Sequence, residues 1–185
     1  GLPEIDEPAM MQQALFALQG VLDLPLQIDT SDVEAMEVGL RHYNGKAMLN
    51  SVNGKQESMH AVFPLVKKYG AVVVCLCLDE SGIPPTAEGR IAIAKKIIAT
   101  AAEYGIPKQQ LVFDALVMTV STDKRNAIET LKAVRVLRHE LGVATTLGVS
   151  NISFGLPKRE MINTAFFTLA LEAGLSAGIM NPLSD

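Results

Sequence analysis

Short runs of apolar residues alternate along the whole chain with longer stretches in which apolar positions recur every three or four residues. The short runs have the length of buried strands, whereas the longer stretches have the period of amphipathic helices. Strands are expected at residues 25–29, 46–50, 71–79, 110–114, 144–151 and 176–181. Helices are expected at residues 8–22, 32–43, 55–69, 87–104, 123–141 and 158–173. Near-continuous apolar strands separated by helices are typical of a parallel sheet covered by helices, so the pattern predicts an α/β fold.

Local signals at the helix ends support these boundaries. Pro8 stands where the first helix begins, a position at which a missing N–H costs nothing. Ser31 and Glu34 have the spacing of a capping box at the start of the second helix. A glycine, which tolerates the left-handed conformation of a C-terminal cap, follows most of the helices. These glycines are Gly45, Gly70, Gly105, Gly142 and Gly174.

A carboxylate or carboxamide side chain stands at the end of every expected strand. These residues are Asp29, Asn50, Asp79, Asp114, Asn151 and Asn181. In a parallel α/β fold the carboxyl ends of the strands lie together on the face where ligands bind. Taken singly, each residue is explained as well by turn or N-cap chemistry. Together, six such residues at corresponding positions favour a polar pocket.

The even distribution of polar strand ends favours a barrel. In an open doubly wound sheet, only the ends near the reversal of strand order converge. A complete eight-stranded barrel typically needs about 250 residues, and this chain has 185. We therefore expect a (β/α)8 TIM-barrel type of fold that lacks its first two strands, with a six-stranded doubly wound sheet as the alternative. Residues 1–185 would form a single domain, a piece of a longer barrel or multidomain chain, with which Gly1 as first residue agrees.

Composition and charge narrow the class of partner. The formal net charge is −4 and the basic residues are scattered, which disfavours nucleic acid and anionic membrane surfaces. No apolar run approaches the roughly 20 residues of a membrane span, and no secretory signal is recognisable. Cys75 and Cys77 lie two apart in a strand, too close to pair comfortably. They are expected to be core thiols in a reducing cytoplasm rather than metal ligands.

The common cofactor and nucleophile motifs are absent from the chain. There is no GxGxxG, GxxxxGK[ST], HExxH or GxSxG sequence. His42, His60 and His139 fall on expected helices, where a solvated or dipole-facing role is favoured over catalysis. What remains is a pocket of Asp and Asn with little fixed positive charge. It suits a neutral heterocycle such as a pterin, because a carboxylate accepts two parallel N–H bonds and an Asn both donates and accepts.

Four segments resemble, in chain order, the pterin-binding barrels: "LQIDTSD", "AMLNSVNG", "VFDALVMTVST" and "GVSNISFGLPKRE". The resemblance extends from about Gly1 to Pro182. It is strongest to the methyltetrahydrofolate-binding domain of cobalamin-dependent methionine synthase and to the methyltetrahydrofolate:corrinoid methyltransferases. Dihydropteroate synthase shares the barrel more distantly. Its last motif resembles "SRK", where this chain reads "SNIS", so the methyltransferases are favoured.

The resemblance implies a role for each matching residue. Asp114 matches the carboxylate that holds the pterin N3–H and exocyclic amine, and Asp29 and Asn50 match the groups on the nitrogens of the other ring. Asn151 matches the asparagine that hydrogen-bonds N5, the atom bearing the methyl group, and is the expected catalytic residue. Further candidates are Ser153, Asn181 and Arg159, which stands beside Lys158 and could meet the glutamate tail of folate. A solvated helix start explains this basic pair about as well.

The reaction implied by the resemblance moves the N5 methyl group of 5-methyltetrahydrofolate to the Co(I) of a corrinoid. The cobalamin would be carried on a partner domain or protein, and a homocysteine-binding domain is a further expected partner. The alternatives are a dihydropteroate synthase-like enzyme, a folate-binding module without chemistry of its own, and a barrel kept for assembly. The family has an Asp-x-Asn element at its second strand, just before this chain begins, so an incomplete pocket is expected. Open sheet edges would also favour a homo-oligomer.

Overall fold

The computed structural model describes residues 6–181 and 183. In this part, helices and strands alternate regularly, and every expected helix and strand is present. The helices are α1 (Glu7–Gln19), α2 (Val33–His42), α3 (Gln56–Tyr69), α4 (Ala87–Glu103), α5 (Arg125–His139) and α6 (Arg159–Glu172). The strands are β1 (Gln27–Asp29), β2 (Met48–Asn53), β3 (Val72–Leu76), β4 (Leu111–Asp114), β5 (Ala144–Gly148) and β6 (Ala177–Ile179). Two 3₁₀-helices are η1 (Lys108–Gln110) and η2 (Val149–Ser153).

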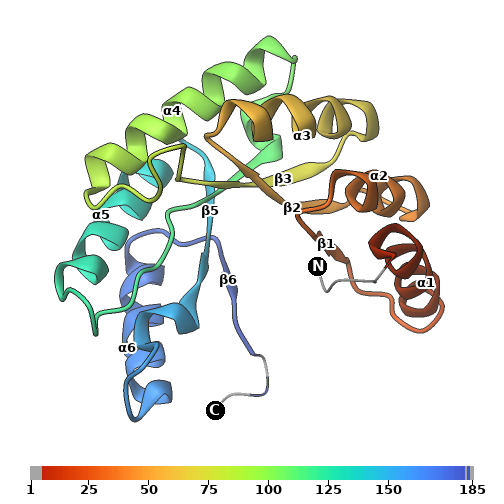
Figure 1. The fold of residues 1–185 in the computed structure, drawn as a ribbon. Helices are drawn as coiled ribbons and strands as arrows, with labels where there is room; N and C mark the ends of the chain where they lie inside the picture. The colour runs from red at the N-terminus through yellow and green to blue at the C-terminus, as the bar shows by residue number, and fades with distance from the viewer. Residues whose placement is uncertain (1–5, 182, 184–185) are drawn as a thin grey trace.

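The strands form one parallel sheet in which each strand pairs with the next strand of the chain, in the order β1-β2-β3-β4-β5-β6. Figure 1 shows that this sheet is curled, with helices α1 to α6 following one another around its outer side. A doubly wound sheet would reverse its strand order near the middle, so that alternative is excluded. The expected barrel-type sheet with six visible strands is confirmed.

Alternation along the strands separates the core from the inner face of the sheet. Successive side chains of a strand point to opposite faces. On the outer face, beneath the helices, the strands bury apolar side chains such as Ile28, Leu49 and Phe113. The residue that follows each of these points to the inner face. These residues are Asp29, Asn50 and Asp114. The curled sheet therefore presents three of the candidate site residues on the same face.

Two of the polar residues expected at strand ends lie elsewhere. β2 does not end at Asn50, because its register against β3 shifts just after this residue and the strand continues to Asn53. β3 ends at Leu76, whereas Asp79 lies in a turn where its Oδ1 accepts a bond from the Ser81 N–H at 2.9 Å. β3 ends before this turn, because the Leu78 N–H bends back onto the Leu76 carbonyl at 2.8 Å and no longer faces a neighbouring strand.

The last two expected strands also end earlier than the sequence predicts. β5 ends at Gly148, so Asn151 lies in η2 and not in the strand. The Phe154 N–H donates to the Asn151 carbonyl at 3.2 Å and closes the 3₁₀ turn. β6 ends at Ile179, and Asn181 lies beyond it. Apolar residues continue past the ends of both strands, but the pairing between β5 and β6 stops at Gly148 and Ile179.

The helix ends agree with the sequence in part. Asp32, not Ser31, caps α2, and its Oδ1 accepts a bond from the Ala35 N–H at 2.8 Å, so the expected capping box of Ser31 and Glu34 is wrong. Gly45 lies beyond the residue that caps α2 and is not its cap. The glycines that follow the four later helices have positive φ, as predicted for a left-handed turn. They are Gly70, Gly105, Gly142 and Gly174.

Candidate functional site

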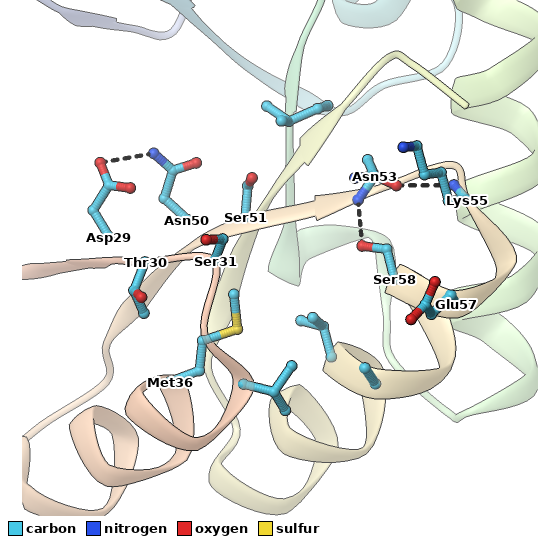
Figure 2. Close-up of a pocket in the computed structure, with 14 residues that line it drawn as sticks. Asp29, Thr30, Ser31, Met36, Asn50, Ser51, Asn53, Lys55, Glu57 and Ser58 are labelled. Carbon is cyan, nitrogen blue, oxygen red and sulfur yellow. Dashed lines mark hydrogen bonds between the residues drawn. The ribbon is translucent and has the colours of Figure 1, made fainter. Parts of the chain in front are cut away.

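A cavity of about 450 Å³ with both polar and apolar lining opens at the carboxyl ends of β1 and β2, against the first turns of α2 and α3. Asp29 and Asn50, which are neighbours in the sheet, both line it. Figure 2 shows their side chains turned toward each other, and the Asn50 Nδ2 donates to the Asp29 Oδ2 at 3.2 Å. Hydroxyl and amide groups from the two following loops complete the polar lining. They belong to Thr30, Ser31, Ser51, Asn53 and Ser58.

The loop between β2 and α3 is shaped by its own polar residues. The Asn53 N–H donates to the Ser58 Oγ at 3.1 Å, and the Asn53 Oδ1 accepts a bond from the Lys55 N–H at 2.9 Å (Figure 2). These residues were not predicted from the sequence. The polar run "NSVN" at the end of β2 was the signal that could have identified Asn53, whereas Lys55 and Ser58 lie beyond it.

Asp114, the last residue of β4, is a buried carboxylate with only 7% of its surface exposed. Its Oδ1 accepts a short bond of 2.7 Å from the Leu116 N–H, and no described residue donates to its Oδ2. Burial raises the pKa of Asp114 to about 6, while the Leu116 N–H and the charge of Arg90 act in the opposite direction. Asp114 is therefore a carboxylate with one oxygen held by the chain and the other without a described donor.

Asp114 does not line the 450 Å³ cavity itself, but it lies beside a residue that does. In the sheet, Asp114 pairs with Leu76 of β3, and Leu76 is part of the cavity wall. Asp29 of β1 and Asn50 of β2 line the same cavity, on the opposite side of β3 from Asp114. The structure thus places the three polar residues along the same inner face, with Asp29 and Asn50 in contact and Asp114 separated from them by β3.

Asn151 is exposed on η2, directly after β5. A Cβ atom on Gly148 would lie only 3.0 Å from the Asn151 Nδ2, so the amide folds back over the end of the strand. The segment is tied to the loop that follows Asp114. The Val120 N–H donates to the Ile152 carbonyl at 3.0 Å. The loop that follows Asp114 and the η2 segment that carries Asn151 are therefore joined, although no hydrogen bond links the two side chains.

Ser153 and Arg159 support the Asn151 segment from within the chain. Ser153 is fully buried, and its Oγ donates to the Asn163 Oδ1 at 2.7 Å. The Arg159 Nε donates to the Ser153 Oγ at 3.0 Å, and its Nη2 donates to the Ser150 carbonyl at 2.9 Å. These contacts fix the backbone on both sides of Asn151, so both candidates have internal bonding roles in this structure.

Asn181, the last of the predicted site residues, lies beyond β6, and the three histidines lie on helices. Asn181 is exposed, and its Oδ1 accepts a bond from the Leu183 N–H at 3.0 Å. The three histidines lie on helices, at His42 in α2, His60 in α3 and His139 in α5. Across residues 6–181 and 183, no group of three or more His, Cys, Asp or Glu side chains could hold a metal ion. In the same residues, no helix is long and apolar enough to cross a membrane.

Comparison with known sequences identifies several relatives over nearly the whole chain. Methionine synthase of Mycobacterium leprae is 35% identical over 178 residues, which are 89% of this chain and 15% of that protein. The methylcorrinoid:tetrahydrofolate methyltransferase of Eubacterium limosum is 28% identical over 187 residues, covering 98% of this chain and 68% of that protein. The chain thus spans a small part of the mycobacterial relative and about two thirds of the other.

Comparison with solved structures identifies the same fold. A structure of Yersinia pestis dihydropteroate synthase with a pterine–sulfa conjugate has a TM-score of 0.73 and 18% identity, over 96% of this chain and 70% of that one. At this identity the likeness establishes the fold. The family model described as "Pterin binding enzyme" matches residues 3–181. The resemblance expected from the four sequence motifs is therefore confirmed, and the chain belongs to the family of pterin-binding enzymes.

Proposed function

We propose that this chain binds 5-methyltetrahydrofolate at the carboxyl ends of its strands and that it is part of a methyltransferase. The observation that carries the proposal is Asp114, a buried carboxylate on the inner face with Oδ1 held at 2.7 Å by a backbone N–H. A buried carboxylate that keeps an oxygen for a ligand is costly unless it binds something. The names of the relatives, methionine synthase and methylcorrinoid:tetrahydrofolate methyltransferase, support folate as that ligand.

In this proposal the pterin ring is recognised by its hydrogen-bonding edge. Asp114 accepts the N3–H and the exocyclic amine, a pair of parallel donors that matches a carboxylate. Asp29 and Asn50 bind the nitrogens of the other ring, where Asn50 is already oriented by its bond to Asp29. These residues bind the substrate rather than react with it. Their loss should raise the dissociation constant more than it lowers the chemical rate.

Asn151 acts at the reacting atom. The tertiary amine N5 is a poor leaving group, so it must gain a proton or a strong hydrogen bond as its bond to the methyl carbon breaks. The Asn151 amide cannot supply a proton at neutral pH, but it can donate to N5 or accept from it as N5 changes protonation state. Its exposed position agrees with a proton that arrives through water. Stabilisation of this late change raises the rate of methyl transfer.

The methyl acceptor belongs to a partner. A corrinoid on that partner would supply the Co(I) centre to which the methyl group passes, while the bonding electron pair stays on N5, and a further domain would present homocysteine as the final acceptor. In this proposal, the strand-end residues of this chain bind the methyl donor. We also place the protein in the cytoplasm, because its two cysteines, Cys75 and Cys77, are free and buried.

A calorimetric titration of 5-methyltetrahydrofolate into the chain and into Asp114→Ala tests the proposed binding. The native chain should bind, and the substitution should weaken affinity by roughly a hundredfold, because it removes a charge-assisted pair of hydrogen bonds. Asp79→Ala is the matched control, since Asp79 lies in a turn outside the proposed contacts. Circular dichroism verifies that all three proteins are folded. Equal affinity of the native chain and Asp114→Ala would contradict the proposed site.

A further inference from the structure

Arg90 of α4 is fully buried and joins two loops at the carboxyl ends of the strands. Its Nε donates to the Pro84 carbonyl at 3.0 Å, in the loop between β3 and α4. Its Nη1 donates to the Leu116 carbonyl at 3.0 Å, in the loop between β4 and α5. Arg90 was not predicted from the sequence as a functional residue. The sequence feature that could have identified it is its position one helical turn from Ala87 and from Ala94, which places it on the buried face of α4.

Thr130 of α5 completes the contact from the other side. It has no exposed surface, and its Oγ1 accepts a bond from the Arg90 Nη1 at 2.8 Å. The same hydroxyl lies 2.9 Å from the Asn126 carbonyl and 3.3 Å from the Leu116 carbonyl, to which it can donate. Arg90 and Thr130 therefore converge on one carbonyl group, that of Leu116.

Leu116 connects this pair to Asp114. It has φ of 64°, a left-handed conformation that a non-glycine residue adopts only when its surroundings hold it there. The conformation turns its N–H onto the Asp114 Oδ1, at 2.7 Å, while its carbonyl receives the bond from Arg90. One residue thus carries a hydrogen-bonded chain from the guanidinium to the carboxylate.

The positive charge of Arg90 is not neutralised by direct contact. Its hydrogen bonds go to neutral oxygens, and its buried Nη2 has no hydrogen-bond partner in the described part of the chain. The charged and titratable groups around it are Asp114 and Cys77, and Glu129, which accepts from the Ala87 N–H at 2.8 Å. The field of Arg90 therefore acts on Asp114 across a buried region where screening by water is weak.

We propose that Arg90, with Thr130, is a positioning residue for Asp114: it fixes the Leu116 backbone that orients the carboxylate, and its charge keeps that carboxylate ionised. The inference rests on the proposed function for the identity of the ligand. Only the ionised carboxylate can accept both N–H groups of the pterin edge. Burial disfavours this form, whereas the Leu116 N–H and the charge of Arg90 favour it.

The test compares the full chain with Arg90→Gln, using Arg125→Gln as a control that removes the same charge from the exposed start of α5. Carbon-13 NMR of the aspartate carboxyl groups follows the ionisation of Asp114 without any ligand, and the Leu116 amide proton reports the bond to Oδ1. In Arg90→Gln the pKa of Asp114 should rise by about one unit. Because binding needs the ionised form, the affinity for 5-methyltetrahydrofolate should then fall about fivefold at pH 6 and should approach the native value above about pH 8. Arg125→Gln should change neither quantity.

Thr130 supplies a second pair of variants in case Arg90→Gln does not fold. Thr130→Val removes the hydroxyl at nearly constant shape and should shift the Leu116 amide resonance and weaken binding several-fold, whereas Thr130→Ser should restore both. A purely structural role would lower the melting temperature without moving the Asp114 titration. An unchanged Asp114 titration in folded Arg90→Gln, or native behaviour of Thr130→Val in both measurements, would overturn the proposal.

The two readouts separate this inference from the proposed function. If the native chain does not bind 5-methyltetrahydrofolate, the proposed function fails. The ligand-free titration of Asp114 and the Leu116 resonance still decide whether Arg90 positions and ionises this carboxylate. If the native chain binds and Asp114 titrates identically in Arg90→Gln, the positioning role fails alone.

Discussion

Asp114 shows how a single residue can oppose stability and serve binding. A carboxylate that is 7% exposed has lost most of its hydration, and burial raises its pKa from an ordinary 3.8 to about 6. The folded state therefore favours the protonated form. The stability that Asp114 contributes is complete below about pH 4 and is lost as the pH rises through about 6. At neutral pH the side chain is mostly ionised, the form that the proposed ligand needs, and the buried charge then lowers the free energy of unfolding.

We therefore expect Asp114→Asn to be more stable than the native chain at neutral pH. An Asn at this position remains uncharged and can still accept the bond from the Leu116 N–H. The free energy of unfolding should rise by roughly 2–3 kcal/mol at about pH 7.5, and this difference should disappear near pH 4. Urea unfolding at the two pH values measures it. A variant that is less stable than the native chain at both values would show that the buried charge costs nothing.

Some of the individual site residues could be predicted from the sequence, and others could not. Asp29 and Asn50 were predicted to share a site, and the structure places them in contact. Their types and their places after apolar runs were sufficient for this. Arg90 was missed, because its role depends on which loop carbonyls meet α4, and this is decided by tertiary packing. No local pattern marks the left-handed conformation of Leu116.

At the scale of elements, the junction between β5 and η2 decides where Asn151 lies. The sequence predicted a strand up to this residue, because apolar composition continues through Val149. The strand instead ends at Gly148, where pairing with β6 ends and a 3₁₀ turn begins. Composition predicts which segments are buried, but strand length depends on the partner strand. Boundaries here were therefore less predictable than the existence and order of the elements.

Gly148→Ala tests the importance of this junction. The backbone of Gly148 has φ of −75°, which alanine tolerates, but the new methyl group would lie 3.0 Å from the Asn151 Nδ2. The Asn151 amide must move, so the rate of methyl transfer should fall about tenfold, with little loss of stability. Gly20→Ala is the matched control, because its methyl group would only meet carbonyl oxygens at 3.4 Å or more. A native transfer rate in folded Gly148→Ala would show that the amide position is not critical.

At the scale of the whole molecule, the alternation of strands and helices was sufficient to predict the fold. Parallel strands joined by helices follow right-handed connections, so a regular alternation leaves few arrangements to consider. The polar strand ends then favoured a barrel over a doubly wound sheet, and the sequential strand order confirms this choice. The sheet that contains β1 and β4 is curled (Figure 1). Asp29 and Asp114, which are distant in sequence, are the last residues of these two strands. Exact distances across the inner face of the sheet depend on the curvature, which composition does not encode.

The central claim is that this face holds 5-methyltetrahydrofolate for transfer of its methyl group. The most direct test is a single-turnover measurement of methyl transfer from 5-methyltetrahydrofolate to a Co(I) corrinoid protein, with the native chain and with Asn151→Ala. We expect transfer by the native chain and a rate lower by roughly a hundredfold in Asn151→Ala, at nearly unchanged affinity for the folate. A native chain that binds the folate but transfers no methyl group, or an Asn151→Ala variant with a native rate, would contradict the account.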